Sequence, residues 1–171
     1  MPTGTGKTET MLSVLISEKI EQLLVIVPTS PLRQQISDKF LKLGLLRELG
    51  IIPEEIKYPV VGTISSSFDT EQNALDFFNK CNVIVATASI LSRMDTAILE
   101  ELKTTCSHLF IDEAHHTEAK TWDSFRKEFE DKYVIQFTAT PFRNDNKKID
   151  GHIIYNYPLR KAQEEGYFKP I

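Results

Sequence analysis

Cysteine, long apolar runs and excess positive charge are all scarce in this sequence. Its 171 residues include only two cysteines, Cys81 and Cys106, which lie far apart in the chain. A disulfide-stabilised secreted scaffold is therefore disfavoured, and we expect two reduced, partly buried thiols. No apolar run approaches membrane-spanning length, and Met1-Pro2 leads into glycines instead of the basic and then apolar regions of a signal peptide. We expect a cytoplasmic protein with no membrane partner.

The charge balance argues against a protein that binds nucleic acid through its overall field. The formal net charge is −4, and neutralisation of phosphates by basic residues dominates nucleic-acid affinity. A local basic groove stays compatible with this balance. The apolar fraction of 41% and the charged fraction of 26% are those of an ordinary globular protein. The length predicts one domain, which we place at residues 1–171.

Short apolar strands alternate with segments of helical periodicity along the chain. We expect strands at 23–27, 60–64, 82–86, 108–111 and 133–137, and an edge strand at 153–157. We expect helices at 8–22, 31–44, 69–78 with Asp69 as its cap, 90–102, 121–130 and 158–166. This alternation predicts an α/β fold with three α/β/α layers and a mostly parallel sheet. In such folds the chemistry gathers at the carboxyl ends of the strands.

The segment Gly4-Thr5-Gly6-Lys7-Thr8 has the composition of a phosphate-binding loop. Glycines let backbone N–H groups turn onto phosphate oxygens, and the positive end of the following helix points at them. Lys7 would neutralise the β- and γ-phosphates, and the Thr8 hydroxyl would ligate Mg²⁺. The alternative is a Gly/Thr-rich loop that merely turns.

Asp112 and Glu113 follow an apolar strand, where two adjacent carboxylates can take different tasks. Asp112 would hold Mg²⁺, and Glu113 would orient the attacking water. The alternative is an acidic loop after a strand. His115 and His116, with Cys106 nearby in sequence, invite a zinc interpretation, but their spacing is not that of a helical His pair and no third ligand is evident.

Five segments in order resemble the first RecA-like motor domain of superfamily two helicases. Among superfamily two helicases, the sequence most resembles the DEAD/DEAH-box branch, which includes the helicase subunits of type III restriction enzymes. The matching segments are Pro2–Thr8, Val27–Gln35, Val85–Leu91, Ile111–His115 and Phe137–Arg143, and the tail at 157–167 also resembles this branch. The fold that the resemblance implies is a P-loop NTPase domain of the RecA-like kind.

The resemblance implies roles for individual residues. The catalytic set would be Lys7, Asp112, Glu113 and His115, with His115 coupling the nucleotide site to the last motif. The residues that would hold the sugar-phosphate backbone of a single strand are Thr29, Arg33, Gln34, Thr87 and Ser89. Those that would relay between the two sites are Thr138, Thr140 and Arg143.

Plainer structural roles remain open beside these. Helix capping by Ser30 or Thr87 would account for the hydroxyls of the nucleic-acid set. Thr138 and Thr140 could be β-branched residues at a strand end. The aromatic residues Trp122, Phe125 and Phe129 stand at helical spacing, which favours a core role over base stacking.

The resemblance also implies cofactors and partners. We expect ATP and Mg²⁺, a nucleic-acid partner with DNA favoured over RNA, and a second RecA-like domain that supplies arginine fingers. A nuclease or methylase subunit is a further candidate partner. The parent protein would be an ATP-dependent helicase or translocase, and the isolated chain would hydrolyse ATP very slowly.

Met1 stands where the first small residue of the loop motif usually lies, so we expect a truncated chain that lacks the strand before the loop and the second motor domain. One alternative function is a non-catalytic nucleotide- or nucleic-acid-binding fragment. Another is a P-loop kinase, against which segments 27–35 and 137–143 argue.

Overall fold

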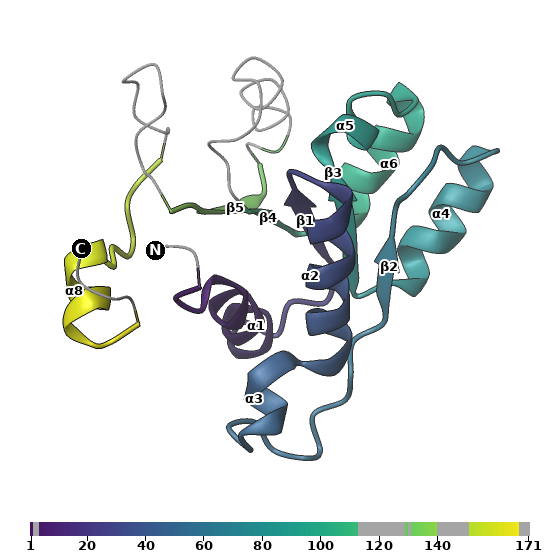
Figure 1. The fold of residues 1–171 in the computed structure, drawn as a ribbon. Coiled ribbons are helices and arrows are strands. Elements are labelled where there is room, and N and C mark those ends of the chain that lie inside the picture. Colours follow the sequence, from purple (N-terminus) through teal and green to yellow (C-terminus); the bar gives the residue numbers. More distant parts are fainter. Residues whose placement is uncertain (2–3, 113–128, 130, 140–150, 168–171) are drawn as a thin grey trace, which may run out of the picture.

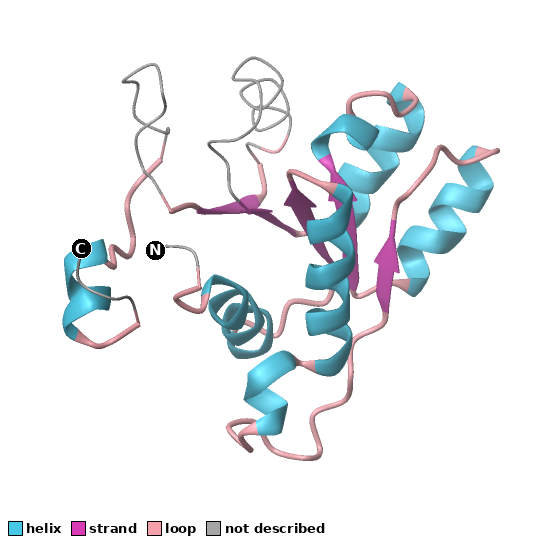
Figure 2. Ribbon diagram, in the orientation of Figure 1, coloured by secondary structure: helices cyan, strands magenta, loops and turns pink. Residues whose placement is uncertain are grey.

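One parallel sheet organises the molecule (Figure 1, Figure 2). The computed structural model describes residues 1, 4–112, 129, 131–139 and 151–167. In this part of the chain five parallel strands are ordered β2-β3-β1-β4-β5. Their bounds are Leu23–Val27 for β1, Val61–Thr63 for β2, Val83–Thr87 for β3, His108–Asp112 for β4 and Tyr133–Phe137 for β5. The predicted mostly parallel α/β sheet is confirmed.

The centre of the sheet is apolar on both faces. Every residue of β1 and of β3 is buried, which explains why both strands appear in the sequence as continuous apolar runs instead of alternating ones. In the ladder Val27 pairs with Thr87, and Asp112 pairs with Phe137. The carboxyl ends of β1, β3, β4 and β5 therefore meet at one edge of the sheet.

Helices cover both faces, which confirms the predicted three layers (Figure 1). The bounds are Lys7–Ser17 for α1, Ser30–Lys42 for α2, Gly44–Glu48 for α3, Glu71–Lys80 for α4, Ala88–Leu91 for α5, Thr96–Thr105 for α6 and Leu159–Glu164 for α8. No helix in the described ranges is both long and apolar enough to cross a membrane.

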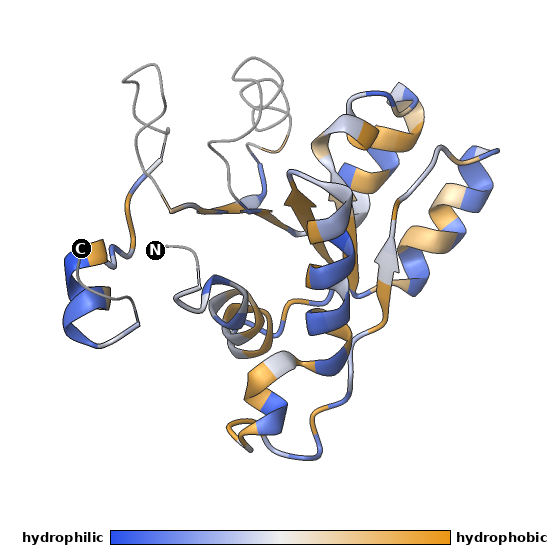
Figure 3. Ribbon diagram, viewed as in Figure 1, coloured by the Kyte–Doolittle hydropathy of each residue, from blue (hydrophilic) through white to orange (hydrophobic). Residues whose placement is uncertain are grey.

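Each face of the sheet has its own hydrophobic core. One core joins α1, α2 and α3 to the strands through residues such as Met11, Phe40 and Phe110. The other joins α4, α5 and α6 through residues such as Phe78 and Leu102. The apolar strands and the inner sides of the helices are visible in Figure 3. Alternate residues of each strand supply the two cores, as the period-2 geometry of a strand requires.

Several helix ends differ from the sequence prediction. Thr70, and not Asp69, caps α4, because its side chain accepts a hydrogen bond from the Asn73 N–H at 3.1 Å. The expected helix at 90–102 is two helices, because the Asp95 backbone, with φ −57° and ψ 141°, is not helical and its side chain caps a new helix through the Ala97 N–H at 2.8 Å.

The sequence prediction can be compared with the structure in three other segments. The sequence predicted no helix between residues 44 and 69, but the structure has the short helix α3 there, and Leu43 at φ 58° separates it from α2. The expected edge strand at 153–157 is wrong, because the structure assigns no strand there and leaves Ile153 and Ile154 exposed. The expected helix at 121–130, with Trp122 and Phe125, lies outside the described residues except for Phe129. Phe129 is fully buried in the core, as predicted.

The two cysteines are free and buried, as the sequence predicted. Burial raises the pKa of the Cys106 thiol to about 12 and also raises the pKa of Cys81. Both thiols therefore stay protonated at neutral pH, which makes them packing residues and poor nucleophiles.

Candidate functional site

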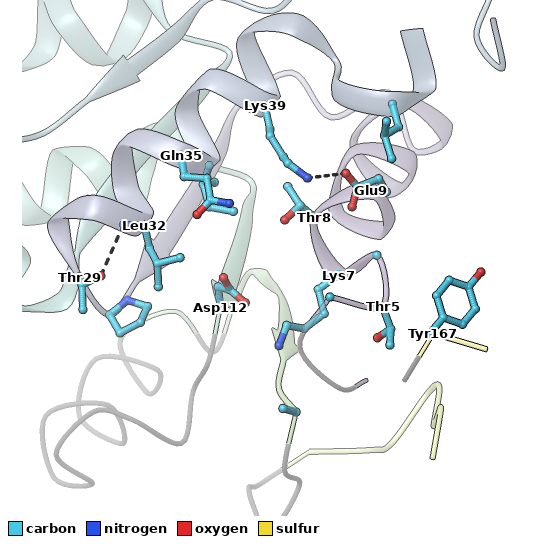
Figure 4. A pocket seen from close by; sticks show the side chains of 16 residues that line it. Thr5, Lys7, Thr8, Glu9, Thr29, Leu32, Gln35, Lys39, Asp112 and Tyr167 are labelled. Atoms are coloured by element: carbon cyan, nitrogen blue, oxygen red, sulfur yellow. Dashed lines mark hydrogen bonds and ion pairs between the residues drawn. The ribbon is translucent and has the colours of Figure 1, made fainter. Parts of the chain in front are cut away.

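A cavity of about 990 Å³ opens at the carboxyl edge of the sheet (Figure 4). It lies between the loop before α1, the helix α2 and the end of β4, which is where ligands bind in open α/β sheets. The volume is at the upper end of the range for small-molecule sites. Its lining includes Gly4, Thr5, Gly6, Lys7, Thr8, Glu9, Pro28, Thr29, Leu32, Gln35, Ile36, Lys39, Leu45, Asp112, Ala139 and Tyr167.

The glycine loop presents backbone to this cavity. Gly4 has a φ of +81° and Gly6 a φ of +88°, a left-handed conformation that other residues rarely adopt. A Cβ placed on either glycine would meet no atom within 4 Å. The space beside the loop is therefore open to a ligand, and Gly6 begins α1 without any side-chain cap. A loop of this form fits a phosphate group held by N–H donors at a helix N-terminus.

Two charged side chains of opposite sign lie in the cavity wall. Lys7, the first residue of α1, is 9% exposed, and Asp112, the last residue of β4, is 6% exposed. Figure 4 shows Lys7 between Asp112 on one side and Thr5 with Tyr167 on the other. Thr8 also lines the cavity, so an oxygen set suited to Mg²⁺, a hydroxyl and a carboxylate, borders the same space.

The structure offers no support for the zinc alternative within the described part. Cys106 precedes β4, whereas Asp112 ends it, so the thiol lies at the opposite edge of the sheet from the cavity. Among the residues that the structure describes, no group of three His, Cys, Asp or Glu side chains could hold a metal ion. Glu113, His115 and His116 lie outside the described residues.

Sequence reasoning missed part of the cavity wall. Glu9 of α1 and Lys39 of α2 form an ion pair of 2.6 Å, with 20% and 37% of their side chains exposed. Gln35, one turn before Lys39 on the same helix, and Tyr167 complete the missed polar and aromatic set. The spacing Gln35 to Lys39 is a helical signal that could have placed both on one face. Nothing in the sequence pointed Tyr167 at this cavity.

The residues after β1 that were predicted to contact nucleic acid form hydrogen bonds within the chain. The Thr29 side chain accepts a hydrogen bond from the Leu32 N–H at 3.4 Å, so Thr29 caps α2 and the expected cap at Ser30 is wrong. The Arg33 Nη1 donates to the Ile64 carbonyl at 2.9 Å, which ties α2 to the end of β2. Gln34 Nε2 donates to Asp38 Oδ1 at 2.9 Å.

The candidates that follow β3 lie at the same edge of the sheet. Thr87 pairs with Val27 in the ladder, is buried and provides no side-chain cap to α5, so capping by Thr87 is also wrong. The Ser89 hydroxyl accepts from Arg93 Nη2 at 3.0 Å, and the Ser89 carbonyl accepts from Arg93 Nε at 2.9 Å. Arg93 is an exposed cation at this edge that the motifs did not include.

The last motif is described only at its start. Thr138 directly follows β5 and its carbonyl accepts from the Met1 amino group at 3.0 Å, while Ala139 lines the cavity. The segment thus runs beside the glycine loop. Thr140 and Arg143 lie outside the described residues.

Comparison with known proteins shows the family to which this chain belongs. A model of the type III restriction enzyme res subunit matches residues 1–143. The chain belongs to this family. Among curated proteins, none matches the sequence.

Two solved structures resemble the domain. The hypothetical ATP-dependent RNA helicase from Sulfolobus tokodaii has a TM-score of 0.55 at 19% identity, over 83% of this chain and 40% of that one. The Hef helicase domain from Pyrococcus furiosus has a TM-score of 0.52 at 25% identity, over 82% of this chain and 29% of that one. The chain thus spans less than half of the length of either helicase structure. Family and fold together support a RecA-like helicase domain of the type III restriction branch.

Proposed function

We propose that the cavity binds Mg·ATP and that the parent protein uses its hydrolysis to move along nucleic acid. One observation carries the proposal: the glycine loop 4–8 and Asp112 line one cavity although they lie far apart in the sequence. The loop offers N–H donors and a cation, and β4 offers a carboxylate. These groups complement the anionic and the metal parts of a Mg·nucleotide.

The chain's residues divide this task between them. The N–H groups of loop 4–8 would hold the phosphate oxygens, and Lys7 would neutralise the β- and γ-phosphates. Thr8 and Asp112 would hold Mg²⁺, which when bound neutralises charge on the phosphate oxygens. Glu113 would orient the attacking water, and His115 would link the site to the segment after β5.

The nucleic-acid face would lie at the carboxyl ends of β1 and β3. Hydroxyls, helix N-termini and single cations suit contact with a sugar-phosphate backbone without reading the bases. We propose that Arg93 adds a cation to this face beside Ser89. The full set would be Thr29, Arg33, Gln34, Thr87, Ser89 and Arg93, with Thr138, Thr140 and Arg143 as the link to the nucleotide site.

The partners follow from the family. A second RecA-like domain of the parent would close over the nucleotide and supply arginine fingers, which are worth on the order of 10³–10⁵ in rate. We infer DNA over RNA as the track, and a nuclease or methylase subunit as a candidate partner of the parent. The chain alone would then bind nucleotide but hydrolyse it very slowly.

Calorimetric titration with Mg·ATP tests the proposal. We expect Lys7→Ala to weaken binding roughly ten- to one-hundred-fold, because charged hydrogen bonds to phosphate are lost. Lys80→Ala, which removes a lysine from the far end of α4, is the matched control and should bind as the wild type does. Equal affinity of Lys7→Ala and wild type would overturn the assignment. Binding without any nucleic-acid-stimulated hydrolysis by the parent would favour the non-catalytic alternative.

A further inference from the structure

The nucleotide cavity has an aromatic residue at one end. Tyr167 lines the same cavity as Thr5 and Lys7 and is 63% exposed. In Figure 4 its ring lies toward the Thr5 end, with Asp112 toward the opposite end. The order along the cavity is therefore carboxylate, lysine, loop and aromatic ring. A ligand whose phosphates lie on the loop, with its metal at Asp112, would extend its other end toward Tyr167.

Backbone hydrogen bonds at the end of α8 hold the segment that carries Tyr167. Gly166 has a φ of +82° and ends α8, with its N–H donating to the Gln163 carbonyl at 3.1 Å and the Tyr167 N–H donating to the Ala162 carbonyl at 2.9 Å. This pair of bonds is the Schellman arrangement, which sets the direction of the residue after the glycine. The end of α8 thus sets the direction in which Tyr167 leaves this helix.

Tyr157 packs against the same segment. The rings of Tyr157 and Tyr167 meet at 6.5 Å between centroids and 82° between planes. The Tyr157 hydroxyl donates to the Glu165 carboxylate, and the Lys161 ammonium lies 5.7 Å from the Tyr157 ring centroid. Tyr157 is 8% exposed, whereas Tyr167 is 63% exposed. The packed ring is therefore Tyr157, and the ring left available to a ligand is Tyr167.

We propose that Tyr167 binds the base of the nucleotide by stacking on it. The inference rests on the proposed function of the cavity and extends it to the part of the ligand that the glycine loop does not contact. A purine presents a broad π-face, and stacking on an aromatic side chain accepts any base with such a face. Tyr167 therefore contributes affinity for purine nucleoside triphosphates without selecting adenine over guanine.

Two ligands, one with a base and one without, distinguish binding of the base from binding of the phosphates. Calorimetry with Mg·ATP and with magnesium tripolyphosphate, which has no base, is applied to wild type, Tyr167→Ala, Tyr167→Leu and Tyr167→Phe. We expect Tyr167→Ala and Tyr167→Leu to bind Mg·ATP roughly five- to one-hundred-fold more weakly, with unchanged affinity for tripolyphosphate. Tyr167→Phe keeps the π-face and should retain wild-type affinity for Mg·ATP. Tyr167→Leu keeps an apolar side chain at the end of α8, so it guards against a loss through local unfolding.

Tyr155→Ala is the matched control, because Tyr155 is 62% exposed and is not part of the cavity wall. It should bind both ligands as the wild type does. Equal loss of both ligands in Tyr167→Ala, or no loss of either, would overturn the stacking role. The Lys7→Ala variant keeps the two proposals distinguishable, since it should lose tripolyphosphate as well as Mg·ATP. A wild-type chain that binds neither ligand would overturn the proposed function and this inference with it.

Discussion

Gly6→Ala separates the fold of the glycine loop from its function. Gly6 has a φ of +88°, and a Cβ added there would meet no atom within 4 Å. The substitution therefore strains the backbone without creating a clash. An L-residue in the left-handed region costs roughly 1–2 kcal/mol, so we expect the free energy of unfolding to fall by about that amount. For a domain of this size the midpoint of thermal unfolding should fall by about 2–8 °C.

The effect of Gly6→Ala on nucleotide binding should be larger than its effect on stability. The added methyl group stands in the space where phosphate oxygens would approach the loop N–H groups. Loss of one or two charge-assisted hydrogen bonds, each worth roughly 1.5–3 kcal/mol, would weaken Mg·ATP binding by tenfold or more. Thermal unfolding followed by circular dichroism and calorimetric titration measure the two effects on the same protein.

Gly50→Ala is the matched control for Gly6→Ala. Gly50 has a φ of +64°, and its added Cβ also meets no atom within 4 Å, but it lies after α3 and outside the cavity wall. It should lose a similar amount of stability and no affinity for Mg·ATP. A folded Gly6→Ala variant with wild-type affinity would refute the phosphate-cradle reasoning. A much larger stability loss in Gly6→Ala than in Gly50→Ala would refute the claim that the loop faces open space.

Two further predictions concern parts of the molecule away from the cavity. Gly62→Ala should lower the free energy of unfolding by roughly 1–3 kcal/mol through overpacking. The added Cβ would lie 2.5 Å from both Cys81 Sγ and Phe77 Cζ. A midpoint of urea unfolding equal to that of the wild type would contradict this prediction. Burial lowers the pKa of His108 although Glu18 opposes the shift, so the unfolded chain binds this proton more readily. Stability should then fall as the pH drops through about 6.5, and His108→Gln should flatten that fall in urea titrations at several pH values; an equally steep fall would show that another group causes it.

The sequence was a good guide to the sheet and to the loop. The strands 23–27 and 133–137 were predicted with the bounds that the structure gives them. Strand 23–27 is a fully buried apolar run, as parallel strands in the middle of a sheet often are, whereas 133–137 is only partly buried and includes Gln136. Lys7 and Asp112 line one cavity, in agreement with the rule that ligand sites of open α/β sheets lie at the carboxyl ends of the strands. Local caps were less predictable, since Asp69 and Thr70 are both good caps and only the backbone decides between them.

The residues that escaped prediction are those placed by tertiary structure. Tyr167 lines the cavity because of where the end of α8 lies in the fold, and no local pattern encodes that proximity. The Glu9–Lys39 ion pair depends on how α1 packs against α2. Arg33 was assigned to nucleic acid from its motif, whereas the structure gives one of its donors to the Ile64 carbonyl. A guanidinium has several other donors, so this bond leaves the proposed role of Arg33 open to test.

The two edges of the sheet differ in chemistry, and this difference locates function. At the amino edge, polar side chains serve their neighbours: Ser107 Oγ donates to the Gln22 carbonyl at 3.1 Å, and Asn82 Nδ2 donates to the Glu21 carbonyl at 3.2 Å. These bonds join adjacent strand starts and need no ligand. At the carboxyl edge, Lys7 and Asp112 are buried in the wall of a cavity. Substitutions at the amino edge should therefore change stability alone, whereas those at the carboxyl edge should change ligand binding.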